Sequence, residues 1–175
     1  MTFYSVGCDP DSKAHGVAIY KDGALIELLN LSLLEFMDKL LELKQLGDIH
    51  VHIENVNGNK AVWHGEEQNK KAYGMTSQNV AKCKQAQIEV ERMLARLQVP
   101  FTHHQPSSAW KKEDQKRQFE LVTGWKGRSN EDNRSAAYFG YLGAGGFKSV
   151  ASGIQPYVKK SGAKKHEVKR YSQSR

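Results

Sequence analysis

Acidic side chains occur at three places where the sequence predicts the end of a strand or the start of a helix. They are Asp9, Glu54, and the adjacent pair Glu131 and Asp132. Carboxylate oxygens are the ligands that Mg²⁺ and Mn²⁺ prefer in proteins. Two such ions at one site can activate a water molecule and stabilise the leaving oxygen of a phosphodiester. If the fold brings the three places together, they predict a metal-dependent centre for phosphodiester cleavage.

Each acidic residue also has an ordinary structural interpretation. Asp9 precedes a proline, as in many turns, and Glu54 can be a solvated strand end. Residues 129–132 fit a capping box, and acids in a first helical turn favour the helix dipole. The small residues 135–137 would let this helix pack closely on a sheet. Its carboxylates would then lie beside Asp9 and Glu54.

Hydrophobic periodicity and chain breakers predict the elements that must position these acids. Strands are predicted at 3–8, 16–20, 24–31, 49–53 and 99–103, with a tight turn at 21–23. Helices are predicted from an N-cap at Ser32 with Glu35 to Leu46, at 76–97, in the charged stretch that ends near Gly124, and at 129–142. Residues 55–74 are predicted to form a long irregular loop. This order describes an α/β fold in which helices pack on a mixed sheet.

The charge divides the chain into two parts. Residues 1–145 hold 18 basic and 18 acidic side chains, whereas 146–175 hold eight basic residues and one acidic residue, so the net charge of +7 belongs to the tail. A uniformly basic, histone-like protein is excluded. We expect a nuclease domain at 1–145 and a basic, flexible tail at 146–175.

The sequence has no long apolar stretch and no leader pattern, so no membrane association is expected. We expect the protein to stay in the cytoplasm or nucleoplasm. Cys8 and Cys83 lack zinc-binding spacing and are predicted to be buried thiols.

Four blocks in order, VGCDPDSKAHGVAIY, HIENV, QPSSAWKK and EDNRSAAYFGY, resemble the RuvC-like Holliday-junction resolvases, particularly small phage-type members. The resemblance covers roughly residues 1–145. It suggests the cytoplasm of a bacterial or phage-infected cell, with an organelle or the nucleus as alternatives. It implies an RNase H-like fold, with a mixed five-stranded sheet and helices on both faces. It also implies a homodimer that nicks four-way DNA junctions symmetrically with Mg²⁺ or Mn²⁺, two ions per site.

The family supplies an Asp from its first strand, a Glu from a later strand and one or two acids from its last helix. These match Asp9, Glu54, and Asp132 with Glu131 second, as catalytic metal ligands. One departure concerns the last helix, where the family often has two acids about three residues apart. Here Arg134 stands three residues after Glu131, and Ser135 stands three after Asp132.

Basic and aromatic residues beside the acids predict contacts to DNA. Lys111 and Lys112 are predicted to approach the scissile phosphate, with Lys112 as a catalytic residue, whereas Trp110 is predicted to pack in the core. The other predicted DNA-binding residues lie in the loop, the long helix and the tail: Lys60, Trp63, Lys70, Lys71, Tyr73, Lys82, Lys84, Lys159, Lys160, Lys164 and Lys165. A solvated surface or a solubilising tail is the alternative for these lysines.

His50 and His52 alternate along a strand and are interpreted as sheet-surface residues, not metal ligands. Two alternatives to a junction resolvase remain open. One is another RNase H-like nuclease that acts on branched DNA or on RNA/DNA hybrids. The other is a non-catalytic junction-binding module whose acids are structural.

Overall fold

The structure, a computed structural model, describes residues 2–58 and 70–145, without the side chains of 70–76. The strands are β1 (Phe3–Asp9), β2 (His15–Lys21), β3 (Ala24–Leu31), β4 (Asp48–Glu54) and β5 (Phe101–His104). The helices are α1 (Leu33–Leu46), α2 (Lys70–Leu97), α3 (Lys116–Thr123) and α4 (Glu131–Gly143). Short 3₁₀ turns occur at Val56–Gly58 and Glu113–Gln115.

The five strands form one mixed sheet in the order β3-β2-β1-β4-β5. The first three strands form an antiparallel meander, while β4 and β5 run parallel to β1. The turn from β2 to β3 is tight because Asp22 and Gly23 both adopt positive φ, of 50° and 90°, as a two-residue hairpin requires. The predicted mixed sheet is confirmed.

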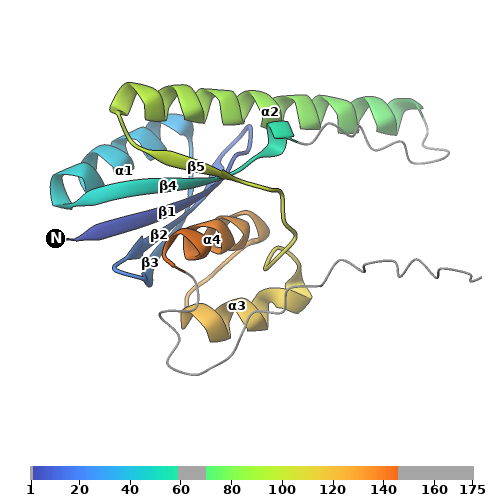
Figure 1. Cartoon of the computed structure of the whole chain (residues 1–175). Coiled ribbons are helices and arrows are strands. Elements are labelled where there is room, and N and C mark those ends of the chain that lie inside the picture. Colours follow the sequence, from blue (N-terminus) through green and yellow to red (C-terminus); the bar gives the residue numbers. More distant parts are fainter. Residues whose placement is uncertain (1, 59–69, 146–175) are drawn as a thin grey trace, which may run out of the picture.

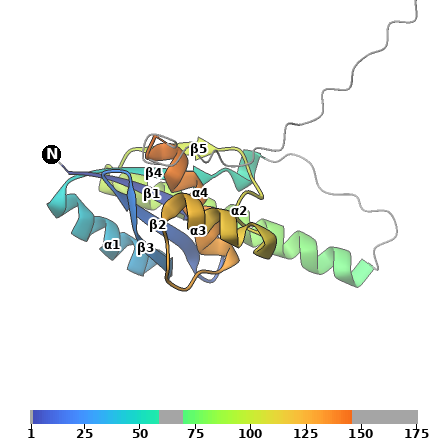
Figure 2. The same cartoon turned by 90° about the horizontal axis from the view of Figure 1, so that it is seen from below.

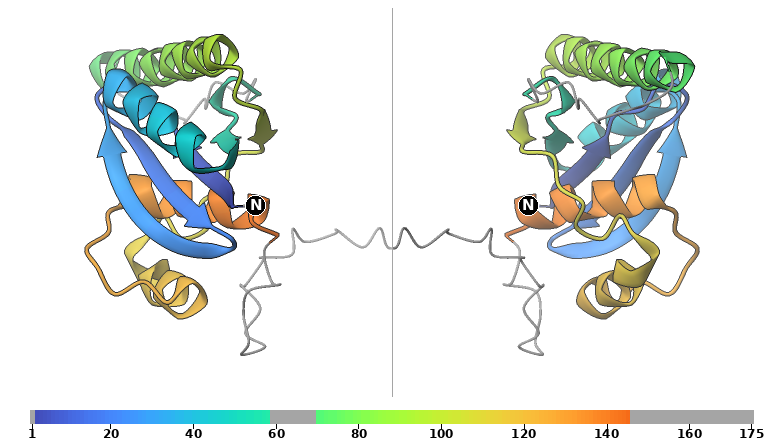
Figure 3. Two further views of the ribbon diagram at one scale, coloured as in Figure 1. Left: turned by 90° about the vertical axis from the view of Figure 1, so that its left-hand side faces the viewer. Right: turned by 90° about the vertical axis from the view of Figure 1, so that its right-hand side faces the viewer.

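Helices cover both faces of this sheet, as predicted (Figure 1, Figure 3). On one face, α1 and α2 pack on apolar side chains such as Val6, Val51 and Ile53, which are fully buried. On the other face, α4 lies against the central strands, and α3 packs outside it. Seen from below, α2 extends well beyond the sheet at its N-terminal end (Figure 2).

Close contact between α4 and the sheet depends on small residues. A Cβ atom at Gly7 of β1 would overlap the backbone carbonyl oxygen of Ala136 and would lie 2.6 Å from the backbone nitrogen of Gly140. Two side chains of the sheet use this contact to donate hydrogen bonds to the helix. Ser5 Oγ donates to the Gly140 carbonyl at 2.7 Å, and Tyr20 Oη donates to the Ala137 carbonyl at 2.9 Å.

The substitution Gly7→Ala is expected to lower the free energy of unfolding by about 2–3 kcal/mol, because the added methyl group must push α4 away from β1. Urea unfolding measures this change. Gly124→Ala is the matched control, since Gly124 has a positive φ of 73° but nothing within 4 Å of an added Cβ atom. We expect the control to cost about 1 kcal/mol. Equal losses for both variants would contradict the close helix packing.

Several boundaries differ from the predictions. The predicted loop 55–74 is wrong at both ends, because Val56–Gly58 is a 3₁₀ turn and α2 already begins at Lys70. The predicted capping box of Ser129 and Asp132 is also wrong. Asn130 is the N-cap of α4, and its side chain and that of Asn133 each accept a hydrogen bond from the other's backbone N–H.

Other local predictions are confirmed. Ser32 and Glu35 form the predicted capping box of α1. Trp110 is a core residue, with 1% of its surface exposed. Cys8 is buried as predicted, but Cys83 is only partly buried. Within the described ranges, no helix combines the length and apolar character needed to cross a membrane.

Candidate active site

Asp9 and Glu54 end the two central strands of the sheet. β1 and β4 are parallel, and their register aligns Cys8 with Ile53, so the next residue of each strand lies at the same edge. Both acidic residues are buried, each with 6% of its surface exposed. Their carboxyl groups interact through a side-chain hydrogen bond and through like charge. The parallel register therefore brings together two acids that are 45 positions apart in the sequence.

The first turn of α4 brings Asp132 to the same edge. Gly16 of β2 pairs with Asp9, and a Cβ atom at Gly16 would overlap the backbone carbonyl of Asp132. The absence of a side chain at Gly16 thus allows the helix to begin directly over the strand that neighbours Asp9. The N-cap of α4 is also tied to the sheet, because the Asn130 side-chain amide donates to Asn30 of the neighbouring strand β3 at 3.0 Å.

A cavity of about 230 Å³ lies at this edge of the sheet. Its lining combines four carboxylates, one lysine, one thiol and three apolar side chains: Asp9, Asp11, Glu54, Asp132, Lys111, Cys83, Pro10, Val56 and Pro106. The residues come from the ends of β1 and β4, from α2, from α4 and from the segment before α3. Elements that are distant in sequence therefore build one acidic cavity, in which Lys111 is the only lysine among the described residues.

Lys111 lies between the two central carboxylates. Its Nζ is 3.0 Å from Asp9 Oδ2, to which it donates a hydrogen bond, and 3.7 Å from Glu54 Oε2. Burial alone would lower the pKa of this ammonium group, but Asp9 and Glu54 outweigh that effect and raise the pKa of Lys111. Lys111 is therefore held in its charged form and neutralises part of the acidic cavity.

The acids themselves are difficult to ionise in this surrounding. Burial and the neighbouring Asp9 raise the pKa of Glu54 from 4.5 to about 7, although Lys111 partly opposes them. Burial, and then Asp9, also raise the pKa of Asp132. Like charges that are forced together in this way are typical of sites that a cation completes.

The donor set fits a hard divalent cation, since Asp9, Glu54 and Asp132 offer carboxylate oxygens from three elements. Within the described residues, however, no three His, Cys, Asp or Glu side chains are already arranged to hold a metal ion. The ammonium group of Lys111 provides the positive charge between two of these carboxylates. The carboxylates are therefore ligands of the type that Mg²⁺ or Mn²⁺ prefers, and the ammonium group of Lys111 lies between two of them.

Two predicted catalytic residues lie outside the cavity. Glu131 is exposed and does not line it, although its charge contributes to the raised pKa of Asp132. Lys112 is also exposed, whereas its neighbour Lys111 enters the cavity. Of each adjacent pair, the structure thus places one member in the site, namely Asp132 and Lys111.

The predicted DNA-binding residues are only partly placed. Lys82 is exposed on α2 and lines a second cavity, of about 300 Å³, that shares Asp11 with the first. Lys84 is partly buried on the same helix. Lys70, Lys71 and Tyr73 belong to the start of α2, and their side chains are not described. The remaining predicted residues lie outside the described residues: Lys60, Trp63, Lys159, Lys160, Lys164 and Lys165.

The interpretation of His52 as a surface residue is wrong. His52 is 8% exposed, because the C-terminal turn of α4 at Gly143 covers its ring. His52 Nδ1 lies 2.9 Å from His104 Nε2, and the ring stacks on His50 at 4.7 Å between centroids. Burial and the neighbouring histidines lower its pKa to about 4. His52 is therefore a neutral packing residue of the sheet.

Sequence reasoning missed Asp11 and Arg134 at this site. Asp11 lines the cavity and accepts a hydrogen bond from the Cys83 thiol at 3.8 Å; its place two residues after Asp9 was a usable signal. Arg134 is buried behind Lys111, with 1% of its surface exposed. A lone arginine among small helical residues gave no pattern from which that position follows.

The strand order of the mixed sheet and the helices on its two faces define the class of fold, which is RNase H-like. The particular likeness is to RuvC. The structure of T. thermophilus RuvC in complex with a Holliday junction substrate matches with a TM-score of 0.51 and 14% sequence identity, over 83% of this chain and 98% of that chain. A second structure of Thermus thermophilus RuvC matches with a TM-score of 0.48 and 13% sequence identity, over 83% of this chain and 97% of that chain.

No family model and no curated protein matches the sequence. At 14% identity, the structural likeness shows a RuvC-like fold. The predicted α/β fold class, a mixed five-stranded sheet with helices on both faces, is confirmed.

Proposed function

We propose that this protein is a Mg²⁺-dependent endonuclease that resolves four-way DNA junctions by paired symmetric nicks. The observation that carries the proposal is the cavity that Asp9, Glu54 and Asp132 line together with Lys111 at the carboxyl edge of a RuvC-like sheet. Buried like charges are costly to a fold. A metal-dependent reaction supplies a reason for their presence.

Asp9, Glu54 and Asp132 would hold the metal, and Glu131 remains a second candidate on α4. Bound Mg²⁺ or Mn²⁺ would supply an activated water and would stabilise the leaving oxygen. Lys111 lies among the same carboxylates, so its ammonium group is within reach of a phosphate placed over the cavity. There it would stabilise negative charge that develops on the phosphate oxygens.

Four-way junctions are proposed as substrate because the matched RuvC structure holds a Holliday junction substrate. Lys82, which is exposed on α2 and lines the second cavity, would add a contact to phosphate beside the site. Two cuts in opposing strands need two active sites that are related by a twofold axis, so we also propose a homodimer. The basic tail at 146–175 would add a salt-dependent contact to phosphates.

A comparison of substrates tests the proposal. Purified full-length protein with Mg²⁺ is incubated with labelled four-way junction, linear duplex, flap and RNA/DNA hybrid, and the products are mapped at nucleotide resolution. We expect paired, symmetric nicks on the junction in preference to the other three. Preferred cutting of the hybrid or the flap would instead indicate another RNase H-like nuclease, and junction binding without cutting would indicate a binding module.

The raised pKa of Glu54, about 7, predicts how the metal requirement depends on pH. Protonated Glu54 is a poor ligand, so the Mg²⁺ concentration for half-maximal cleavage should increase up to about tenfold per pH unit below pH 7. Above pH 8 it should stay nearly constant. Mg²⁺ titrations of the cleavage rate at pH 6, 7, 8 and 8.5 measure this dependence. A half-maximal Mg²⁺ concentration that does not change between pH 6 and 8 would contradict a role for Glu54 as a ligand.

A further inference from the structure

We propose that Arg134 is a positioning residue, which holds Lys111 in the active site by binding the backbone on both sides of it. This inference rests on the proposed function only for the catalytic consequence. The geometry it depends on lies in the segment 106–112, which connects β5 to the turn before α3 and has no regular secondary structure. Such a segment needs contacts from elsewhere to keep one side chain in place.

The guanidinium group of Arg134 supplies these contacts. Its Nε donates to the carbonyl of Trp110 at 2.9 Å, and one terminal nitrogen donates to the carbonyl of Lys111 at 3.0 Å. The same terminal nitrogen lies 3.2 Å from Glu113 Oε2, and the other reaches Ser129 at 3.4 Å. The planar, fixed fork of arginine suits consecutive carbonyl groups, which a single ammonium group cannot engage in the same way.

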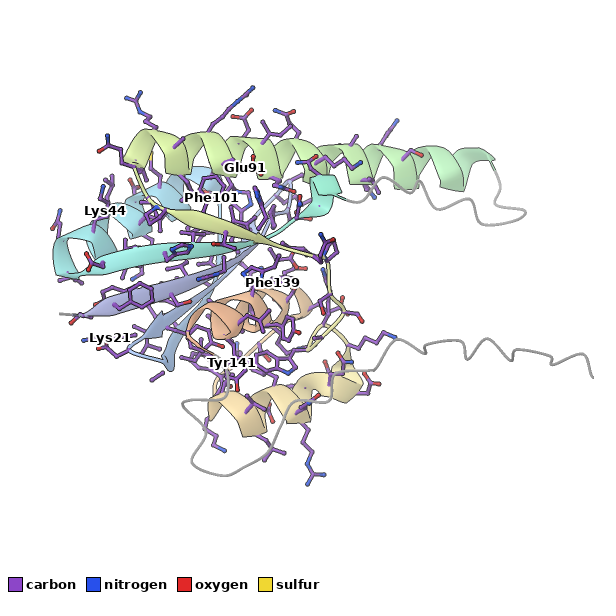
Figure 4. The ribbon with its side chains drawn as sticks, viewed as in Figure 1. Lys21, Lys44, Glu91, Phe101, Phe139 and Tyr141 are labelled. Atoms are coloured by element: carbon purple, nitrogen blue, oxygen red, sulfur yellow. The ribbon has the colours of Figure 1, made fainter. Side chains whose placement is uncertain are left out.

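We call the hydrogen bonds from Arg134 to the carbonyl groups of Trp110 and Lys111 the Arg134 clamp. The conformation of Trp110 shows why this clamp is needed. Trp110 has a φ of 63°, a left-handed conformation that costs a large side chain about 1–2 kcal/mol. Its ring is buried against the rings of Phe119 and Tyr141, whose centroids lie 5.5 and 5.3 Å away. Figure 4 shows Tyr141 on the side of α4 that faces α3. The buried ring and the Arg134 clamp together keep the chain in this turn, which directs the next residue, Lys111, into the cavity.

Arg134 also links the lysine to the acids. It lies on α4 only two residues after Asp132, so one helical turn presents an acid to the cavity and an arginine to the backbone that carries Lys111. A surface ion pair alone does not account for the burial of Arg134. Glu113, its acidic partner, has 76% of its side chain exposed, whereas the Arg134 side chain has 2%.

A double-mutant cycle tests the proposal on junction cleavage at saturating DNA and Mg²⁺. We expect Arg134→Gln to reduce kcat at least tenfold, Lys111→Ala to reduce it further, and the double variant to be no slower than Lys111→Ala alone. The KM for DNA should change less than kcat. If the two single losses multiply in the double variant, Arg134 does not act through Lys111 and the proposal is overturned.

A second measurement does not need nuclease activity. Brief acetylation followed by peptide mass spectrometry reports how accessible each lysine is, and Arg134→Gln should increase the labelling of Lys111 severalfold. Arg92→Gln, which removes an exposed arginine of α2, should leave it unchanged. Increased labelling in a protein that cuts no junction would reject the proposed function but retain the clamp. Unchanged labelling would overturn the clamp.

Arg134→Lys distinguishes positioning from a purely structural role. It keeps the charge but cannot bridge both carbonyls in the geometry of arginine, so we expect a folded protein with intermediate kcat and intermediate labelling of Lys111. Circular dichroism and thermal unfolding verify the fold of each variant. If even Arg134→Lys fails to fold, Arg134 serves the fold as a whole and the positioning role is rejected.

Discussion

Asp9→Asn is expected to reduce junction cleavage by about 1,000-fold or more while DNA binding is retained or strengthened. Asparagine has nearly the same shape but removes the charge from the acid that contacts both Lys111 and Glu54. Loss of a metal-binding charge removes the chemistry. Loss of a negative charge beside a phosphate should also reduce repulsion of the DNA. Single-turnover cleavage and equilibrium junction binding, measured at the same salt concentration, give the two quantities.

Asp48→Asn is the matched control for this variant. Asp48 begins β4, at the opposite end of the strand from Glu54, and is exposed. The same chemical change there should alter neither cleavage nor binding by more than about twofold, as for most surface substitutions. A junction-binding module without activity would show no cleavage in any of the three proteins. Full cleavage by Asp9→Asn would exclude Asp9 from the reaction.

Glu54→Gln is expected to stabilise the metal-free protein and to abolish cleavage. The pKa of Glu54 is raised from 4.5 to about 7, so the native state favours the protonated form. The contribution of that proton to the free energy of unfolding is complete below pH 4.5 and is lost as the pH rises to 7. Because one pKa unit corresponds to about 1.4 kcal/mol, the ionised carboxylate costs the fold up to about 3 kcal/mol above pH 7. Glutamine is free of this cost.

Thermal unfolding in EDTA at pH 5 and pH 8 measures the effect. The variant should melt several degrees above the parent protein at pH 8, and the difference should shrink at pH 5. Both proteins contain the same histidines, so the difference between them isolates the contribution of Glu54. Added Mg²⁺ should stabilise the parent and not the variant. Destabilisation by Glu54→Gln at pH 8 would mean that the acid is a structural partner of Lys111.

The core of the fold and the central acids follow from local sequence patterns. Apolar strands that end in Asp9 and Glu54 are short-range signals, and parallel pairing then places their ends together. α2 illustrates where such signals fail. Gly74 and the polar residues around it indicate a loop, yet the helix begins at Lys70, since one glycine costs a helix only about 1 kcal/mol.

The pair Lys111 and Lys112 shows a different limit. Both residues are equivalent in composition, and the choice between them depends on the left-handed turn at Trp110 and on its contacts with Arg134. Those contacts join segments that are 24 positions apart. His52 is similar, because strand alternation cannot show that the end of α4 covers this position. Long-range packing decides these details, and no local pattern contains it.

The lysine between the acids has a thermodynamic consequence for the proposed reaction. The ammonium group of Lys111 lies 3.0 Å from Asp9 and 3.7 Å from Glu54, so a metal ion that binds these carboxylates would compete with an internal cation. Under the proposed function, a DNA phosphate that attracts Lys111 would release those carboxylates. DNA would then increase the affinity for Mg²⁺, and by reciprocity Mg²⁺ would increase the affinity for DNA by the same factor. The proposed active site would thus assemble its full metal complement only on its substrate, which would limit nicking of DNA that is not bound productively.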